Sequence, residues 1–312
     1  MGRCSEMVCV GGVQLQGISV GGVETCIILP QFNVAFDIGR CPQRAVYQDT
    51  VLITHAHMDH IGGINFHIAS RQLLSLPPPT VVLPTPNVPA VEALLAAHRE
   101  LDGCDMRVNL VPARPADKVE VQLKKGGCVA RCFPTIHPVP SQGYAVITQK
   151  RKLKPEYHGL PGREIAALRR DGVEVSDVVE VAEVAFSGDT TGDFLLLNKD
   201  NPDVRHAKLL IMECTFVEDG TTMEDAEKFG HTHVGHVLRP ECLEVLRDVG
   251  HVLFIHFSAR YRVEDVEANM RERLPGWLLQ KSSFMTEGFG ARHGAHCPPV
   301  LHGADMAAAL PP

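Results

Sequence analysis

The chain has 312 residues, 45% of them hydrophobic, and a formal net charge of −7 with histidine neutral. That length lets one large domain, or one domain with an insertion, bury a sizeable core. The negative balance argues against a protein coated in positive charge for nucleic acid, so any such binding has to rely on a local basic patch.

No run of apolar residues approaches the length needed to span a bilayer, and residues 1–9 lack a charged stretch followed by an apolar core. The ten cysteines are scattered and form no CxxC pair, so we expect reduced thiols. These features predict a soluble protein with no membrane partner, in the cytoplasm, with the nucleus as an alternative compartment.

The first part of the chain reads as a β-meander, because short β-rich runs alternate with glycine turns between Val8 and Phe36. Asp37 follows directly. A carboxylate there suits either a hydrogen-bond partner of nearby metal ligands or a turn cap, and the sequence leaves both readings open.

Three imidazoles and one carboxylate then fall within six residues, directly after the apolar run 51–53: His55, His57, Asp59 and His60. In an extended segment alternate residues point the same way, so His55 and His57 can converge on one cation. After a turn, Asp59 and His60 can face a second. Neutral imidazole and carboxylate suit zinc, with manganese or iron as alternatives. The stretch predicts a metal site where a buried strand ends, and a solvated polar turn is the bland alternative.

The middle of the chain continues with helical spacing over 64–76, a strand at 81–83 and a helix over 88–101, as in a βα repeat. Paired strands at 119–123 and 128–133 lead to His137, and the proline after it blocks a helix. From Lys150 to Asp171, seven basic residues oppose three acidic ones: Lys150, Arg151, Lys152, Lys154, Arg163, Arg169 and Arg170. This block, with a short helix at 163–170, predicts a basic arm, and a solvated charged excursion is the alternative.

The second half supplies more polar residues at strand ends. Asp189 follows an apolar run beside Gly188, Glu213 ends the run 209–212, and His256 follows the run 251–255. His231 precedes a helix expected over 234–248, and another helix is expected over 263–273. The segment 291–312 is rich in Gly, Pro, Ala and His and is expected to be a disordered tail, in which His293 and His296 are not ligands.

Seven donors thus come from four strand ends: His55, His57, Asp59, His60, His137, Asp189 and His256. They are enough for two metals with a bridging water between them. Such a site hydrolyses esters, amides, thioesters or phosphodiesters, and the histidines by themselves do not choose among these substrates.

The HxHxDH pattern resembles the signature of the metallo-β-lactamase superfamily, which implies an α/β fold of the four-layer αββα sandwich type. Three further features resemble the short form of the tRNase Z family: the arm over 152–162, the motifs at 213–215 and 230–233, and the segment 256–261. Residues 36–44 and 187–190 look particularly like the plant-type short form. The resemblance implies a catalytic domain over 8–290 with a protruding, flexible arm inserted at about 150–180, followed by the tail 291–312.

The resemblance also implies roles for the site residues. His55, His57 and His137 hold one zinc, Asp59, His60 and His256 hold the other, and Asp189 bridges the two, with manganese as an alternative metal. Asp59 orients the attacking water and accepts its proton. Glu213 and His231 form the pair that protonates the departing 3′ oxygen. For Glu213 the alternative is a carboxylate paired with a nearby base, and for His231 a neighbour of a helix cap, with His233 as a substitute acid.

The implied activity is zinc-dependent removal of the 3′ trailer from precursor tRNA, leaving a 3′-hydroxyl. The basic arm, including Lys150, Arg151, Lys152, Lys154 and Arg163, is expected to bind the tRNA backbone, and a homodimer is implied. The PxKxRN loop of many short forms is absent, and 40–44 occupies its place, which leaves the cleavage position open. The rival readings are a dinuclear hydrolase of a small thioester or lactam, and an inactive metal- or RNA-binding protein.

Overall fold

The chain folds around two sheets whose strands neighbour one another in chain order. The computed structural model describes residues 6–124, 126–289 and 300–304. Within these residues the first sheet contains β1 (Val8–Val10), β2 (Val13–Val20), β3 (Glu24–Leu29), β4 (Val34–Phe36), β5 (Thr50–Leu52), β6 (Thr80–Pro84) and β7 (Asn109–Ala113). The second contains β8 (Glu120–Gln122), β9 (Cys128–Pro134), β10 (Gln142–Leu153), β11 (Ser176–Phe186), β12 (Leu209–Glu213), β13 (His251–Ile255), β14 (Ser282–Met285) and β15 (Val300–His302).

The direction of the strands changes along each sheet. β1 to β4 pair antiparallel, which confirms the predicted meander, and β4 to β7 pair parallel. In the second sheet β11 to β14 are parallel, and the outer strands on both sides are antiparallel. Every residue of β4, β5 and β12 is buried, as expected where a parallel sheet is covered on both faces.

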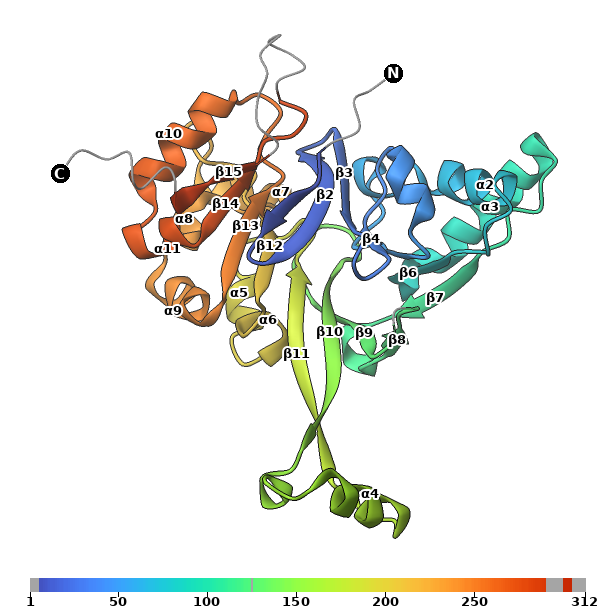
Figure 1. Cartoon of the computed structure of the whole chain (residues 1–312). Helices are drawn as coiled ribbons and strands as arrows, with labels where there is room; N and C mark the ends of the chain where they lie inside the picture. Colours follow the sequence, from blue (N-terminus) through green and yellow to red (C-terminus); the bar gives the residue numbers. More distant parts are fainter. Residues whose placement is uncertain (1–5, 125, 290–299, 305–312) are drawn as a thin grey trace.

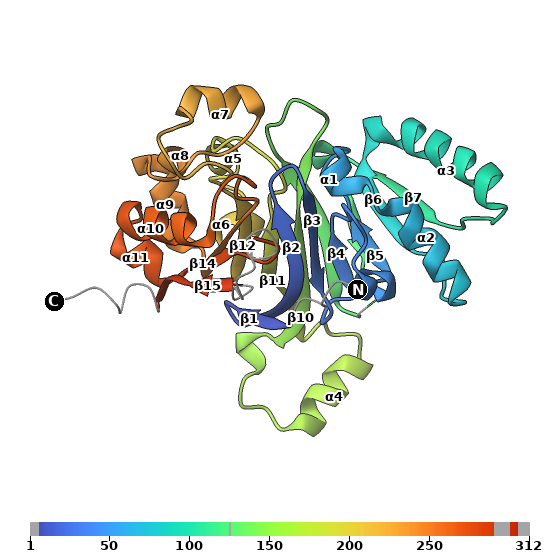
Figure 2. The same ribbon diagram turned by 90° about the horizontal axis from the view of Figure 1, so that it is seen from above.

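Helices cover the outer face of each sheet, as Figures 1 and 2 show. On the first sheet lie α1 (Met58–Ile61), α2 (Ile64–Leu73) and α3 (Val88–Asp102). The second carries α5 (Phe194–Leu197), α6 (Pro202–Arg205), α7 (Met223–Phe229), α8 (Val234–Val237), α9 (Pro240–Asp248), α10 (Val263–Arg273) and α11 (Gly276–Gln280). Short 3₁₀ turns occupy η1 (Gln43–Tyr47), η2 (Thr85–Asn87), η3 (Pro115–Asp117) and η4 (Pro155–Tyr157).

Three hydrophobic clusters correspond to the three interfaces of a four-layer fold. One cluster packs α2 and α3 against the first sheet, through Ile64, Ile68 and Leu95. Another packs the helices α9, α10 and α11 against the second sheet. The third lies between the sheets, where the rings of Phe36 and Phe186 stack with centroids 4.6 Å apart. The predicted αββα sandwich is therefore confirmed.

The arm is the outer part of the β10–β11 hairpin, whose strands pair as far as Leu153 and Ser176. It projects from the body and carries α4 (Gly162–Arg170), which has no buried residue (Figure 1). The helix expected at 163–170 is thus present. Across the whole projection, 150–178, seven basic residues face five acidic ones, because Glu174 lies just before the returning strand β11 and Asp177 lies on it. The arm is therefore less basic than residues 150–171 suggest.

Two sequence expectations need correction. The helix expected over 234–248 is two helices, α8 and α9, because Pro240 lacks an N–H and is tolerated only in the first turn of a new helix. The disordered tail predicted for 291–312 is wrong at Val300–His302, which pair antiparallel with β14 as strand β15. Residues 290–299 and 305–312, with His293 and His296, lie outside the described residues. In the described part of the chain, no helix is both long and apolar enough to cross a bilayer.

Candidate metal and catalytic site

The polar residues singled out in the sequence meet at the carboxyl ends of strands from both sheets. Their positions follow from the strands that precede them: Asp37 after β4, His55 after β5, His137 after β9, Asp189 after β11, Glu213 at the end of β12 and His256 after β13. Side chains at the carboxyl ends of parallel strands share one edge of a sheet, which is the usual place for a site in such sheets. Asp59 and His256, 197 positions apart, thereby become neighbours.

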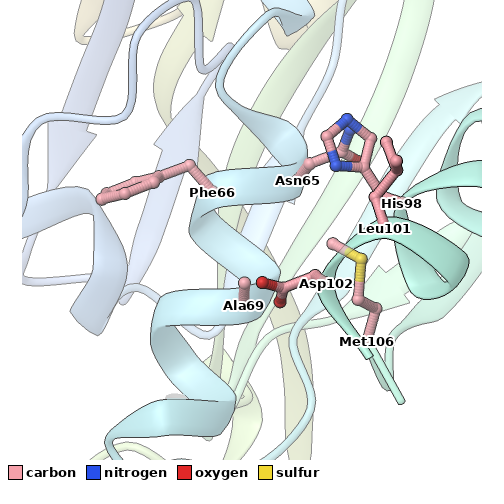
Figure 3. A pocket seen from close by; sticks show the side chains of 7 residues that line it. All are labelled: Asn65, Phe66, Ala69, His98, Leu101, Asp102 and Met106. Atoms are coloured by element: carbon pink, nitrogen blue, oxygen red, sulfur yellow. The ribbon is translucent and has the colours of Figure 1, made fainter. Parts of the chain in front are cut away.

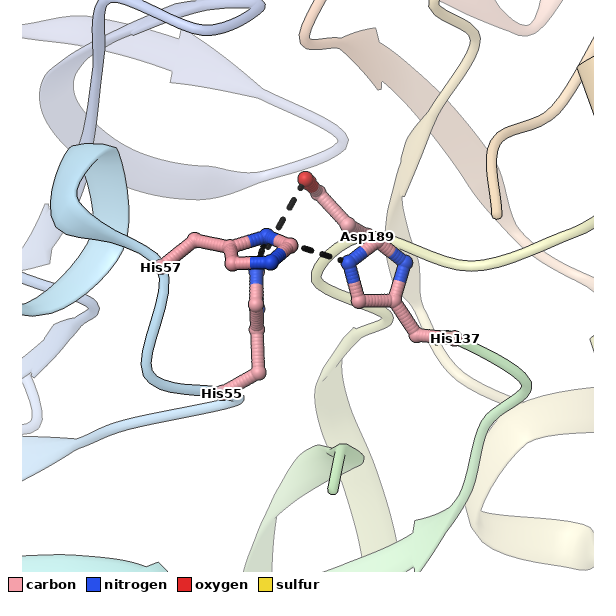
Figure 4. A group of neighbouring side chains, drawn as sticks. All are labelled: His55, His57, His137 and Asp189. Atoms are coloured by element: carbon pink, nitrogen blue, oxygen red, sulfur yellow. Dashed lines mark hydrogen bonds and ion pairs between the residues drawn. The ribbon is translucent and has the colours of Figure 1, made fainter. Parts of the chain in front are cut away.

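The four side chains of the first predicted metal set lie close together (Figure 4). His57 Nδ1 lies 3.1 Å from His55 Nε2 and 3.2 Å from His137 Nε2, and Asp189 Oδ2 lies 3.8 Å from His55 Nε2. Tetrahedral zinc with bonds of about 2.0–2.1 Å places its ligand atoms roughly 3.3 Å apart, so the spacing suits such an ion. All four ligand atoms lie within 4.8 Å of one another.

The second set, Asp59, His60 and His256, lies beside the first. Asp59 Oδ2 is 3.6 Å from His60 Nε2 and 3.5 Å from His256 Nε2. Asp189 faces both sets, since its Oδ2 lies 3.2 Å from His60 Nε2 and its Oδ1 lies 3.4 Å from His256 Nε2. This is the position expected of a bridging carboxylate.

The hydrogen bonds behind these histidines leave the inward nitrogens for a cation. His60 Nδ1 bonds Asp37 at 2.8 Å, His137 Nδ1 bonds the Gly230 carbonyl at 2.9 Å, and His256 Nδ1 lies 3.1 Å from Thr215 Oγ1. The buried Nε2 atoms of His60 and His256 have no hydrogen-bond partner among the described residues. Buried polar atoms without partners are costly, and metal-ligating histidines usually bond through their other nitrogen. The donor set therefore fits a divalent metal.

The electrostatics of the site agree with this reading. Burial lowers the pKa of His55 well below its ordinary value, so the ring is the neutral imidazole that ligates metals. Burial alone would also lower the pKa of His60, but Asp189 and Asp37 raise it well above its usual range. Two carboxylates that favour a positive charge at this point also favour a bound cation.

Asp37, for which the sequence left two readings, bonds the metal loop. Its Oδ1 accepts from the Thr54 backbone N–H at 2.7 Å, and its Oδ2 accepts from His60 Nδ1. Asp37 and His256 both have left-handed backbone conformations, with φ of 56° and 61°. Such conformations are uncommon for residues other than glycine and concentrate at functional sites.

Glu213 and His231 form a pair next to the metal sets. Glu213 is fully buried, and its Oε1 lies 2.9 Å from His231 Nδ1 and 2.9 Å from the Thr190 N–H. Its Oε2 accepts from both the N–H and the hydroxyl of Thr215 and from the Thr232 N–H. Burial would lower the pKa of His231, but Glu213 outweighs it and raises the pKa to about 9. Glu213 thus bonds the histidine rather than a lysine or arginine.

His233 has a different place. Its Nδ1 accepts from the Gly235 N–H and caps α8, and its Nε2 bonds the Glu218 carbonyl at 3.1 Å. Both ring nitrogens are therefore used within the fold, which leaves His231 as the histidine of this motif that suits acid catalysis. The five predicted arm residues lie on the projecting hairpin and not among these side chains; Arg151 pairs with Glu174 at 3.3 Å, and Lys154 lies 4.0 Å from Asp177.

Sequence reasoning missed Thr215, whose hydroxyl donates to Glu213 and lies within 3.3 Å of both His231 Nδ1 and His256 Nδ1. It joins the Glu213–His231 pair to the second metal set. It also missed the carbonyl of Gly230, which holds His137. Neither has a local signal, since each acts through a residue distant in the chain.

Comparison with known proteins finds relatives with high sequence identity over most of the chain. The chain is 42% identical over 280 residues to tRNase Z TRZ1 of Arabidopsis thaliana, covering 90% of this chain and 97% of that protein. The chain belongs to the tRNase Z family. A second relative, the chloroplastic tRNase Z TRZ2 of the same plant, is 39% identical over 89% of this chain and 77% of its own length. The nuclear ribonuclease Z of Triticum aestivum is 44% identical over 57% of this chain and 99% of its own length.

Solved structures agree on the architecture. The short form of human tRNase Z superposes with a TM-score of 0.54 at 18% identity, covering 79% of this chain and 93% of that one. The metallo-β-lactamase fold protein YhfI of Bacillus subtilis gives a TM-score of 0.51 at 17% identity, covering 82% and 88%. No protein-family model matches the chain. In this tRNase Z, the fold places the two metal sets and the Glu213–His231 pair next to one another.

Proposed function

We propose that this chain is an endoribonuclease that removes the 3′ trailer from precursor tRNA by hydrolysing one phosphodiester bond, leaving a 3′-hydroxyl on the tRNA. The observation that carries the proposal is the match to tRNase Z TRZ1, which spans nearly the whole of both proteins. The hydrogen-bonded Glu213–His231 pair beside the metal sets supports it, because an alkoxide leaving group needs a positioned acid.

Two zinc ions per subunit are the metals we expect, with manganese as an alternative. His55, His57 and His137 would hold one, Asp59, His60 and His256 the other, and Asp189 would contact both. Divalent cations bound there lower the pKa of water and offset the negative charge of a phosphoryl transition state. Imidazole-rich ligand sets favour zinc over magnesium or calcium.

The protein's own side chains then divide the proton transfers. Asp59, 15% exposed, borders the space between the sets and accepts the proton of the attacking water. His231 bonds Glu213 through Nδ1, so its Nε2 is the atom that donates a proton to the departing 3′ oxygen. Glu213 fixes the orientation of the ring and favours its protonated form.

Binding of tRNA is assigned to the arm. Lys150, Arg151, Lys152 and Arg163 are exposed on the hairpin and can reach backbone phosphates. Phosphate contacts fix position without reading base sequence, so recognition of tRNA by its shape follows.

A homodimer completes the proposal, with α2 and α3 as the contact surface. Phe66 and Leu73 of α2 are 65% and 85% exposed, and Leu101 of α3 is 81% exposed. Residues seven apart share one face of a helix, as Phe66 and Leu73 do. A hollow of about 320 Å³ separates the two helices (Figure 3). Exposed apolar surface of this kind suits a self-complementary contact.

Light scattering tests the proposed dimer. Leu73→Lys should give monomers, and a monomeric wild type would contradict the dimer.

The activity is tested by incubating the zinc-loaded protein with a precursor tRNA that carries a 3′ trailer. We expect a tRNA ending in a 3′-hydroxyl, and no cleavage after chelation. Intact RNA together with turnover of a glutathione thioester would favour the rival hydrolase instead.

We expect a cytoplasmic location, with the nucleus as the alternative. The cysteines of the described residues are all free thiols, which is consistent with a reducing compartment. Fractionation of cells that express the tagged protein tests the location.

A further inference from the structure

An exposed aromatic ring stands two residues before the proposed acid. Phe229 ends α7 and is 58% exposed. Its ring centroid lies 6.3 Å from that of Phe216, which in turn lies 6.2 Å from the ring of His231. The three rings therefore form a short chain from solvent to the site, with Phe229 at its outer end.

The backbone around Phe229 is fixed by the site itself. Gly230 closes α7 in a left-handed conformation with φ of 78°, and its N–H bonds the Glu227 carbonyl at 2.9 Å. The His231 N–H bonds the Ala226 carbonyl at 2.9 Å, and the Gly230 carbonyl accepts from His137. Phe229 is therefore held at a constant position relative to both the acid and a metal ligand.

Phe216 supports this arrangement but offers little surface of its own, because it is 8% exposed. The guanidinium carbon of Arg260 lies 5.4 Å from its ring centroid, and Arg260 is held by hydrogen bonds to Thr221 and Tyr261. Of the two phenylalanines, Phe229 is thus the one whose ring is open to a partner.

The proposed chemistry indicates which partner comes close. His231 donates its proton to the 3′ oxygen of the last nucleotide that the tRNA keeps, so this nucleotide must lie within hydrogen-bond reach of the ring. The base of that nucleotide is attached to the same ribose and is the nearest apolar surface of the substrate. Bases stack on aromatic side chains, and the contact tolerates every base because each has a π-face.

We propose that Phe229 is a substrate-positioning residue that stacks on the base of the last retained nucleotide of the tRNA. The inference rests on the proposed function. It gives the exposed ring a partner, and it places the 3′ oxygen before His231 without reading the identity of the base.

The test compares Phe229→Ala with wild type on two precursor tRNAs, one intact and one abasic at the last retained nucleotide. On intact RNA the variant should lose roughly 5- to 100-fold in kcat/KM, the range that base–aromatic stacking supplies. On abasic RNA the two proteins should be equal, because the stacking partner is already gone. Phe229→Trp should keep the wild-type rate, and hydrolysis of bis(p-nitrophenyl) phosphate should be unchanged. Leu197→Ala, at another apolar residue 52% exposed, is the matched control and should behave as wild type.

An equal loss on intact and abasic RNA, or no loss on either, overturns the inference. So does a loss on the small diester, which would mean a structural role, or a change in oligomeric state, which would place the ring between copies of the chain. Failure of the wild type to cleave precursor tRNA would refute the proposed function and the inference with it, and it is recognised separately because it precedes any comparison of variants.

Discussion

His137 Nδ1 donates a hydrogen bond of 2.9 Å to the carbonyl oxygen of Gly230, which lies 93 residues further along the chain. His137 belongs to the first metal set, and Gly230 directly precedes His231. One hydrogen bond therefore joins a proposed metal ligand to the backbone that positions the proposed acid.

Gly230→Ala should disrupt both metal binding and the positioning of the proposed acid. A Cβ at this position would lie 2.1 Å from Pro138 Cδ and 2.7 Å from His137 Nδ1, and φ of 78° is unfavourable for alanine. We expect loss of bound zinc by elemental analysis and loss of activity. Gly172→Ala is the matched control: its φ is 81°, but among the described residues, chain neighbours aside, no atom lies within 4 Å of the added Cβ. It should cost roughly 1–2 kcal/mol of unfolding free energy and leave zinc content unchanged. Equal zinc content in the two variants would contradict the proposed link.

Asp37→Asn should weaken metal binding. Asparagine also tolerates the left-handed backbone, but it removes the negative charge that holds His60. We expect zinc affinity, measured by competition with a chelator, to fall about 10- to 100-fold. Asp49→Asn is the control, because Asp49 bonds Arg71 and Lys124 away from the metal sets. It should lower thermal stability with unchanged zinc affinity; a similar drop in zinc affinity in both variants would count against a specific role of Asp37.

Glu213→Gln and His231→Ala should distinguish leaving groups. Protonation by a general acid contributes roughly 10²- to 10⁴-fold when the leaving oxygen is basic, as the ribose 3′ oxygen is. p-Nitrophenolate leaves without such help. We expect large losses of kcat on precursor tRNA and small ones on bis(p-nitrophenyl) phosphate. His233→Asn, at the cap of α8, should affect both substrates alike. Parallel losses on both substrates for His231→Ala would argue against its role as the acid.

The arm should serve tRNA binding and not hydrolysis. Gln149 and Glu180 are paired across the hairpin, so residues 150–179, which include all the predicted arm residues, can be replaced by an Asn-Gly turn without disturbing the body. This protein should bind tRNA about 10-fold or more weakly at low salt, with a shallower salt dependence, because phosphate contacts are lost. Hydrolysis of bis(p-nitrophenyl) phosphate should persist. Unchanged tRNA affinity in a binding assay would refute the role of the arm.

His67 should make the fold sensitive to acid. Burial, followed by the nearby Arg71, lowers its pKa from 6.5 to about 4. The unfolded chain therefore binds more protons between pH 6.5 and 4, and the fold loses stability as the pH falls through that window, by about 3 kcal/mol in total. His67→Gln keeps a donor for the Ala45 carbonyl and removes the titration. Urea unfolding at a series of pH values should show a smaller acid loss for the variant, and identical slopes would contradict the assignment.

Local sequence was enough for part of this molecule. The alternation of His55 and His57 after an apolar run placed the metal loop at a strand end, and glycine turns marked the meander. Pro240 is a local signal that would have predicted the break between α8 and α9. These features depend on residues close together in the chain, where side-chain period and backbone preference act directly.

Resemblance to a family was needed to predict the complete set of site residues. Only the tertiary structure shows how their atoms come together. Asp189 faces both metal sets because β11 and β13 of the second sheet end on the same side of the sandwich as β5 of the first sheet. Thr215 meets His256 because a parallel sheet aligns the ends of β12 and β13. Glu213 meets His231 because the loop between α7 and α8 packs against the end of β12. The capping role of His233, the strand β15 and the exposure of Phe229 beside the acid likewise depend on which surfaces pack together, and no local pattern encodes that.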